Sequence, residues 1–397
     1  MNLRFIIARR LSHKGRVATA AVSVSFLVVI IAVAVSSGFR YEIRDGLSEL
    51  TGDVQMTMAD MNYLDESSPV SISQSYLPHV EQIKGVRSVD PVIYRAGIVK
   101  HEGDIYGVMI KGVEGGVTSV TGTAVPDSVA LSVAIPASLA ESAGLTVGNR
   151  LLTYFVGEKV KVRQFNVVDV YEPIVRTDDR FLVYASIEDM QRLNGWSEDQ
   201  TSMFEVTLED EYKDEFMMQE VSCNISDAVH VYRSEDDDRL IAVSSVDRFP
   251  QIFEWLALID FNVVFVLVLM IAVAGVNMIT GLLILLFENI STIGLLKALG
   301  MNNREIMNVF LTRAAGTVLK GMFIGNVIAF ALCFIQQMTH VLTLDPVNYF
   351  VSYVPVHLNV SDILTADIIA FISIMLLLVL PSLFVLKIDP SRTIKMD

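Results

Sequence analysis

The sequence predicts an integral membrane α-helical protein with four transmembrane helices and a large external α/β domain inserted between the first and second helices. Two observations indicate this fold class. Four segments contain no Asp, Glu, Lys or Arg, and each holds roughly 20 residues or more, enough for a helix to cross the hydrocarbon core of a bilayer. About 220 polar-rich residues separate the first segment from the second. The charge-free segments are 17–39, 261–287, 321–344 and 368–386.

Lysine and arginine predict which side each loop faces, because short cytoplasmic loops carry an excess of both. Basic residues and no acidic residue precede the first span, and bases also lie between the second and third spans and after the fourth. The loop between the third and fourth spans has no Lys or Arg. We therefore expect both termini in the cytoplasm and the large domain outside.

These patterns predict the following order along the chain. It comprises a cytoplasmic N-terminus (1–16), transmembrane helices (17–39, 260–287, 309–338 and 365–386), an external domain (40–259), a cytoplasmic loop (288–308), an external loop (339–364) and a cytoplasmic C-terminus (387–397).

Charge is distributed unevenly between the external domain and the rest of the chain. Residues 40–255 hold 37 acids and 18 bases, a net charge of −19, whereas the remainder sums to +4 and completes the total of −15. This balance excludes a nucleic-acid protein with a basic footprint. The acidic surface is either a solvated face or one that steers a basic partner.

No catalytic, metal or cofactor motif is found. The chain lacks a GxxxxGK[ST] loop, HExxH and GxSxG, its six histidines are scattered, and the acids at 235–238 lack the spacing of a calcium loop, which indicates a solvated loop. Cys223 is external and Cys333 lies in the third span, so they cannot pair. Within the charge-free segments His340 is the ionisable residue, near an end, so no proton relay is expected. The chain is therefore not expected to be an enzyme.

The external domain alternates short strand and helix patterns, which predicts mixed α/β structure. One hairpin is expected from 94–99 and 105–113, with its turn at 101–104, and another from 151–155 and 160–170. Helices are expected at 137–143 and 187–193. We expect two subdomains, the second inserted at about 115–200.

The cytoplasmic loop contains a predicted amphipathic helix from Asn289 to Leu299, and Gly300 is placed to end it. Ile293, Leu296 and Gly300 share one stripe, whereas Glu288, Thr292 and Lys297 can face water. Two interpretations stay open: a helix on the lipid surface that links two spans, or a coupling helix that docks in a cleft of a separate ATPase.

This loop carries a family resemblance. It reads E-x-x-x-T-I-G-L-L-K-A-L-G at 288–300 and R-E-I-M-N-V-F-L at 304–311, which resembles the FtsX-like permease superfamily of ABC transporters. Further segments resemble the lipoprotein-releasing LolC/LolE type, although Asn149 replaces an acid of that pattern. They are 37–45, 131–149, 354–358, 381–382 and 389–391.

The resemblance implies a function and partners. Such permeases work in the bacterial inner membrane with a cytoplasmic ABC ATPase subunit and a second permease subunit, as a homodimer or heterodimer. They extract lipoprotein cargo from the membrane and pass it to a periplasmic lipoprotein carrier. Their external region has two subdomains, called Porter and Sabre. Here the turn at 156–159 is too short for the extended hook that captures the carrier in the LolC type, so carrier recruitment stays open.

The resemblance also implies site residues. The ATPase-coupling residues are Glu288, Thr292, Ile293, Leu295, Leu296, Lys297, Leu299 and Gly300. The first two spans flank the external domain and are the expected walls of a cargo cavity. The alternative interpretation is that the candidate residues are ordinary side chains that face lipid or other helices. The candidates are Val24, Phe26, Phe39, Phe261, Phe265 and Met270. Five glycines are expected at close helix contacts: Gly275, Gly281, Gly316, Gly321 and Gly325.

Two other functions within the superfamily remain open at this point. One is an efflux permease for a drug, toxin or peptide, although fused efflux permeases carry an ATPase domain that this chain lacks. The other is an FtsX-like mechanotransmitter that activates a periplasmic cell-wall hydrolase, although such proteins have smaller external regions.

Overall fold

The computed structural model describes residues 16–59, 68–101, 103–124, 130–157, 159–173 and 181–383. The predicted cytoplasmic ends at 1–16 and 387–397 therefore lie outside the described residues, except for Arg16. The chain divides into two compact units. We call Met1–Tyr41, Trp255–Thr343 and Tyr353–Asp397 the membrane unit, and Glu42–Glu254 with Leu344–Ser352 the sheet unit.

In the described part of the chain, four helices are long and apolar enough to cross a membrane, as predicted. Each of the four begins before its charge-free segment. Helix α2 continues through Arg40–Asp45 and ends only before Gly52, whose φ of +70° suits glycine and stops the helix. The four are α2 (Arg16–Thr51), α9 (Pro250–Glu288), α11 (Asn303–Thr339) and α13 (Val360–Ser382).

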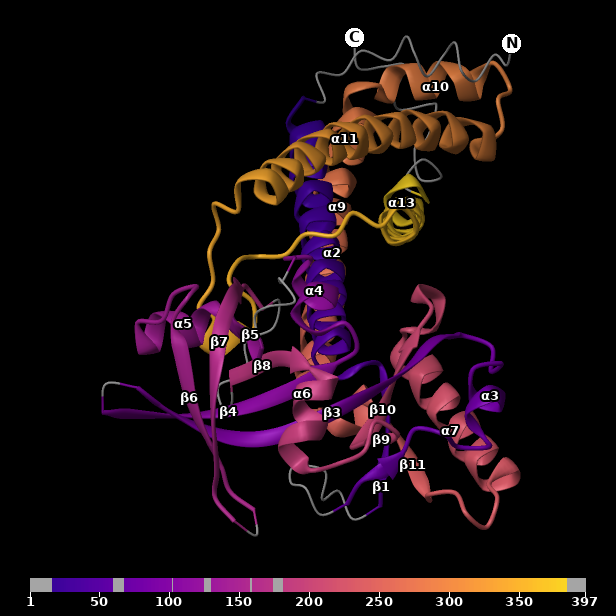
Figure 1. The fold of residues 1–397 in the computed structure, drawn as a ribbon. Helices are drawn as coiled ribbons and strands as arrows, with labels where there is room; N and C mark the ends of the chain where they lie inside the picture. The colour runs from indigo at the N-terminus through magenta and orange to yellow at the C-terminus, as the bar shows by residue number, and fades with distance from the viewer. Residues whose placement is uncertain are drawn as a thin grey trace. The chain divides into compact units, whose positions relative to one another are not determined.

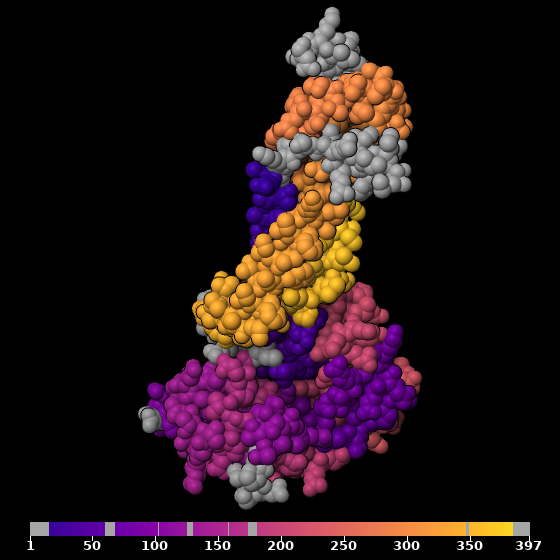
Figure 2. Space-filling model, turned by 90° about the horizontal axis from the view of Figure 1, so that it is seen from above, coloured from indigo at the N-terminus to yellow at the C-terminus, as the bar shows by residue number. Residues whose placement is uncertain are grey.

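Glycines let the helices of the membrane unit approach closely. A Cβ added to Gly325 would lie 2.5 Å from the Ser23 carbonyl oxygen of α2, and one added to Gly321 would lie 2.6 Å from Val22. A Cβ on Gly275 would lie 2.5 Å from Leu377 of α13. Helices α11 and α13, orange and yellow in Figure 2, also lie side by side.

The prediction of close contacts is thus confirmed at Gly321, Gly325 and Gly275. It is wrong at Gly316, because no atom lies within 4 Å of a Cβ built there. Gly281 is intermediate, with Ala18 at an ordinary contact distance of 3.4 Å.

The described strands of the sheet unit form a nine-stranded mixed sheet in the order β11-β1-β10-β3-β4-β8-β5-β7-β6, and β2 pairs separately with β9 (Figure 1). Strand β3 also pairs with β6, which closes β3, β4, β8, β5, β7 and β6 into a ring. The strands are β1 (Val54–Met58), β2 (Val70–Ser71), β3 (Val86–His101), β4 (Asp104–Val113), β5 (Ser132–Pro136), β6 (Arg150–Phe155), β7 (Lys161–Tyr171), β8 (Phe181–Ser186), β9 (Gln200–Thr201), β10 (Met203–Leu208) and β11 (Leu240–Ser244).

Short helices cover both parts of this sheet. Helix α7 packs against β11, α3 and α8, whereas α4, α5 and α6 pack against strands of the ring. The helices are α3 (Leu77–Val80), α4 (Gly116–Thr121), α5 (Ala137–Ala143), α6 (Ile187–Asn194), α7 (Glu215–Tyr232), α8 (Ser245–Arg248) and α12 (Pro346–Tyr349), with a 3₁₀ turn at Asp210–Tyr212. Inward-facing side chains from alternate strand positions, such as Val99, Phe155 and Phe165, fill the ring.

The predicted hairpins are present. Strands β3 and β4 pair down to His101 and Asp104, and β6 pairs with β7 from Arg150 to Phe155. Strand β3 is longer than the predicted strand 94–99, because its first half pairs with β10 and its second half with β4. The ring therefore includes strands before residue 115, so an insertion at about 115–200 stays a prediction.

Candidate functional site

The predicted coupling helix is α10 (Ile290–Ala298), and it ends as the sequence indicates. Gly300 has a φ of +87°, its N–H donates to the Lys297 carbonyl at 3.0 Å, and the Met301 N–H donates to the Leu296 carbonyl at 3.0 Å. These two bonds form a Schellman motif, which satisfies carbonyls that a helix end leaves free. Gly300 therefore ends α10 by its backbone conformation.

The structure separates the predicted coupling residues into two faces. Ile293 is fully buried, and Leu296 packs beside it against the core of the membrane unit. Leu295 and Leu299 are 56% and 75% exposed. Thr292 is exposed one turn before Leu295, and we call Thr292, Leu295 and Leu299 the outer face of α10.

Two of the predicted positions differ from expectation. Gly300 is exposed and does not continue the buried stripe, because it lies beyond the last residue of α10 in a left-handed conformation. Lys297 is half-buried where an aqueous position was expected. Glu288 is exposed as expected, and it is the last residue of α9.

Two sequence motifs that lie far apart in the chain meet in the membrane unit. The His357 N–H donates to the Ala34 carbonyl of α2 at 3.0 Å, and its ring stacks on Tyr41 at 4.6 Å. A Cβ on Gly38 would lie 2.4 Å from the Pro355 carbonyl oxygen, so only glycine permits this approach. The segments 37–45 and 354–358 carry the family resemblance, and part of each packs against the other.

Polar side chains join the same stretch of α2 to its neighbouring helices. Ser36 donates to Asp260 of α9 at 2.6 Å, and Arg40 forms an ion pair with the same carboxylate. Ser37 donates to Asp362 of α13 at 3.1 Å. These contacts hold α2, α9 and α13 together where α2 leaves its charge-free segment.

The candidate cavity residues do not share one environment. Phe26 is buried beside Gly325, and Phe39 packs edge-on against Trp255 at 5.6 Å. The others are exposed or half-buried on the surface of the membrane unit: Val24, Phe261, Phe265 and Met270. The cavity stays a prediction.

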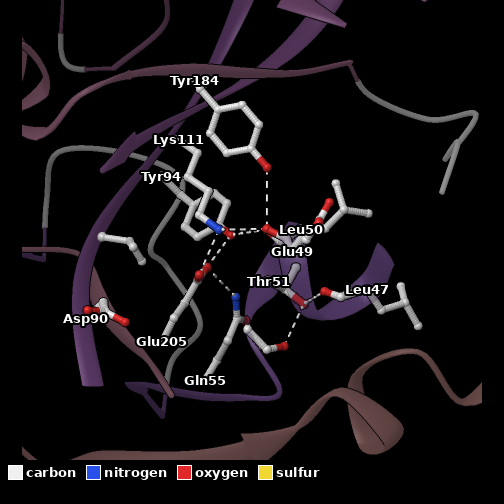
Figure 3. Close-up of polar contacts among 12 residues, drawn as sticks. Leu47, Glu49, Leu50, Thr51, Gln55, Asp90, Tyr94, Lys111, Tyr184 and Glu205 are labelled. Carbon is white, nitrogen blue, oxygen red and sulfur yellow. Dashed lines mark hydrogen bonds and ion pairs between the residues drawn. The ribbon is translucent and has the colours of Figure 1, made fainter. Parts of the chain in front are cut away.

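A polar cluster that was not predicted lies inside the sheet unit, around the C-terminal end of α2 (Figure 3). Lys111 of β4 forms a buried ion pair with Glu205 of β10 at 2.7 Å and donates to the Leu50 carbonyl at 3.0 Å. The Tyr94 hydroxyl of β3 lies 2.9 Å from the Leu50 carbonyl and 2.5 Å from the Glu205 carboxylate. Tyr184 of β8 donates to the Glu49 carbonyl at 3.4 Å. We call Lys111, Glu205, Tyr94 and Tyr184 the anchor cluster.

The electrostatics of the anchor cluster suit its position. The C-terminal end of a helix carries partial negative charge, which favours an ammonium group there. Burial and the neighbouring Glu205 carboxylate raise the pKa of Tyr94 well above its ordinary value, so the phenol keeps its proton and remains a donor. Removing one member of a buried ion pair typically costs about 3–5 kcal/mol. A sequence signal existed, since Lys111 and Glu205 are charged residues inside apolar strand patterns.

A buried carboxyl lies in the membrane unit, contrary to the expectation for the spans. Asp367 of α13 is 7% exposed and accepts a hydrogen bond from the Asn326 side chain of α11 at 2.6 Å. Asp367 precedes the charge-free segment 368–386 by one residue, which is why counting charges missed it. The pair is a polar link between two membrane helices.

The acidic run at 235–238 is more ordered than a solvated loop. Asp237 accepts hydrogen bonds from the backbone of Ser75 and Ser234, and Asp238 accepts from Gln74 and from the Ser71 backbone, each at 2.7–3.2 Å. These carboxylates therefore hold the segment before α3. Among the described residues, no group of three or more His, Cys, Asp and Glu side chains is placed to hold a metal ion.

Four candidate membrane helices, a mixed sheet between the first two and the capped helix α10 are the architecture of a polytopic membrane protein. Residues 17–223, more than half of the chain, match the family described as the MacB-like periplasmic core domain, and residues 264–390 match the FtsX-like permease C-terminal family. The chain therefore belongs to the FtsX-like permeases with a MacB-like periplasmic core domain.

One curated relative covers nearly the whole chain. It is the lipoprotein-releasing system transmembrane protein LolC of Neisseria meningitidis serogroup B (strain ATCC BAA-335 / MC58). The two are 23% identical over 423 residues, which cover 99% of this chain and 95% of LolC. The resemblance to the LolC/LolE type is thereby supported along the full length.

Solved structures of external regions are also similar to part of the chain. The extracellular domain of the ABC-type transporter YknZ from Gram-positive bacteria is 13% identical with a TM-score of 0.29, covering 48% of this chain and all of YknZ's. The periplasmic region of MacB from Actinobacillus actinomycetemcomitans is 13% identical with a TM-score of 0.31, covering 51% of this chain and 91% of MacB's.

Proposed function

We propose that this chain is the permease subunit of an ABC transporter that extracts lipoproteins from the inner membrane for transfer to the outer membrane. The full-length similarity to a lipoprotein-releasing permease supports this function. Both termini and α10 are cytoplasmic in this proposal, and the sheet unit is periplasmic. The cargo would pass to a periplasmic carrier, with the short turn at 156–159 leaving its docking place to be found.

The observation that carries the proposal is the outer face of α10. Leu295 and Leu299 are large, exposed apolar side chains on a helix whose other face is packed and whose end is capped. An apolar helix face of this kind is suited to a groove in a partner protein. The partner is a separate cytoplasmic ABC ATPase, which would pass its nucleotide-driven motion to the membrane helices through α10.

The physical chemistry of lipoprotein cargo explains the need for such a motor. Burying an acyl chain is worth about 0.8 kcal/mol per CH₂, so three long chains resist transfer to water by tens of kcal/mol. The cargo must therefore move from bilayer into an apolar cavity without meeting water. Four helices are few for such a cavity, so a second permease subunit completes it, and the exposed Val24, Phe261 and Phe265 are available for cargo, lipid or that subunit.

The test is reconstitution of the chain with its co-purifying ATPase in liposomes that contain triacylated lipoprotein. The readout is ATP-dependent appearance of lipoprotein on a soluble periplasmic carrier. The double variant L295D/L299D should lose both permease-dependent stimulation of ATP hydrolysis and release, because two carboxylates would enter an apolar interface.

The matched control is F216D/V231D, since Phe216 and Val231 on α7 are 69% and 68% exposed and the two changes introduce the same charge elsewhere. It should leave the stimulation of ATP hydrolysis intact. Leu296→Asp is a poorer probe, because Leu296 packs against the core and its loss would disturb the membrane unit. Full ATPase stimulation without release by the wild-type chain would instead favour efflux or mechanotransmission.

A further inference from the structure

The anchor cluster joins one end of a membrane helix to several strands at once. Helix α2 is continuous from Arg16 to Thr51, so it carries the first candidate span and also ends inside the sheet unit. Its last free carbonyls, at Glu49 and Leu50, accept hydrogen bonds from side chains of β3, β4 and β8. Through Glu205 the cluster also includes β10.

Further contacts hold the preceding turns of α2. Ile43 and Leu47 are fully buried in the sheet unit. Lys213, which precedes α7, is buried and lies 3.4 Å from Asp45. The last two turns of α2 are therefore held by an apolar face and by directional polar contacts on different sides.

A helix end does not require a buried ion pair for stability. Replacing such a pair by apolar residues of similar volume is often neutral or stabilising, since desolvation offsets the Coulomb attraction. What the pair adds is direction, because hydrogen bonds from an ammonium group and a phenol resist sliding and rotation of the helix, whereas an apolar contact tolerates both. The arrangement is suited to transmitting displacement.

We propose that Lys111 is a positioning residue that, with Glu205 and Tyr94, locks the C-terminal turn of α2 to the sheet. Axial movement or rotation of α2 is thereby passed to the ring formed by β3, β4, β8, β5, β7 and β6. This inference rests on the proposed function, in which ATP hydrolysis moves the membrane helices.

The first test is the double variant K111M/E205L in the complete, reconstituted transporter. It keeps an apolar pair of similar size, so thermal unfolding and permease-stimulated ATP hydrolysis should match the wild type, whereas ATP-dependent release should fall to the ATP-free background. The control R192M breaks an ion pair at a 74% exposed arginine on α6 and should change none of the three readouts.

A second variant tests the same contact with a smaller change, which is less disruptive to folding. Y94F removes one hydroxyl and no charge, and it should lower release about two- to five-fold, in proportion to one lost hydrogen bond, with ATP hydrolysis unchanged.

The decisive test is a covalent rescue. A Cβ on Gly52 would lie 3.0 Å from the Glu205 Cβ, and a disulfide needs about 3.5–4.5 Å, so a small shift permits one. Cysteine is strained at the φ of +70° of Gly52, so the oxidised protein is first shown by thermal unfolding to be folded. In K111M/G52C/E205C, with Cys223→Ser to remove the exposed thiol, the oxidised protein should release lipoprotein and the reduced protein should not.

The outcomes separate this inference from the function on which it rests. Normal release by K111M/E205L would overturn the lock and leave the proposed function standing. The same holds if oxidation of K111M/G52C/E205C/C223S does not restore the lost release. Absence of release by the wild-type chain would instead refute the proposed function. Release by the oxidised form alone would establish that the link between α2 and the sheet must be rigid.

Discussion

Substituting alanine at two glycines of α11 gives a quantitative test of how the membrane unit packs. Gly325 and Gly316 lie nine residues apart on the same helix. A Cβ on Gly325 would lie 2.5 Å from the Ser23 carbonyl oxygen, 3.0 Å from the Phe26 Cβ and 3.1 Å from the Leu27 N, whereas one on Gly316 meets nothing within 4 Å. The two changes are chemically identical, and only their surroundings differ.

The expected magnitudes follow from two opposing effects. Replacing glycine by alanine inside a helix is favourable by about 1 kcal/mol at either position. At Gly325 the new methyl group collides with backbone atoms of α2, which cannot rotate away, and overpacking of this kind costs about 1–3 kcal/mol. The gain in helix propensity is the same in both variants and cancels when they are compared. Gly325→Ala should therefore be less stable than Gly316→Ala by about 1–3 kcal/mol.

The assay is thermal or denaturant unfolding of both detergent-solubilised variants beside the wild type. Gly316→Ala should unfold at or above the wild-type midpoint, and the midpoint of Gly325→Ala should be lower than that of Gly316→Ala. Equal midpoints for the two variants would refute the packing of α11 on α2, whatever their common shift.

Three further changes test other parts of the structure. Gly300→Ala should lower stability by about 1 kcal/mol in a melting experiment, because alanine is strained at the φ of +87° that ends α10; an unchanged midpoint would contradict the Schellman cap. Asp367→Leu leaves the buried Asn326 amide without its acceptor and should cost about 1–3 kcal/mol in the same assay, whereas Asp367→Asn keeps an acceptor and should stay near the wild type. Burial tends to raise the pKa of Asp237, but hydrogen bonds that include one from Ser75 lower it to about 2. Since this lies below the unfolded value of about 3.9, the stabilising contribution is complete above about pH 4 and is lost as pH falls toward 2. Melting from pH 5 to pH 2 should therefore show a smaller loss in Ser75→Ala than in the wild type; equal losses would argue against this bond.

The coupling helix shows how far local sequence can be taken. The predicted limits, Asn289 and Leu299, differ from the observed α10 by one residue at each end, because Gly300 is a local stop signal. The orientation of the helix is a different matter. Leu295 and Leu296 are neighbours with the same side chain, yet one is exposed and the other packed, since successive residues point about 100° apart and only the surrounding helices define the inside.

The sequence by itself determined the four candidate membrane spans and the family resemblance. A run of about 20 apolar residues without charge has a stable place across a bilayer, and this follows from composition without knowledge of any contact. The start of α13 marks the limit of that reasoning, since Asp367 lies just outside such a run and is nevertheless buried against Asn326.

Only the tertiary structure decided the anchor cluster and the closed ring. Lys111 and Glu205 are 94 positions apart, and their meeting depends on the order β10-β3-β4, in which β3 pairs with both neighbours. Helix α2 meets them because no stop signal ends it before Gly52, twelve residues beyond Arg40. Helix ends and membrane spans are set by neighbours in sequence. A buried ion pair between strands depends on which strands become neighbours in the sheet, and local sequence patterns do not contain that information.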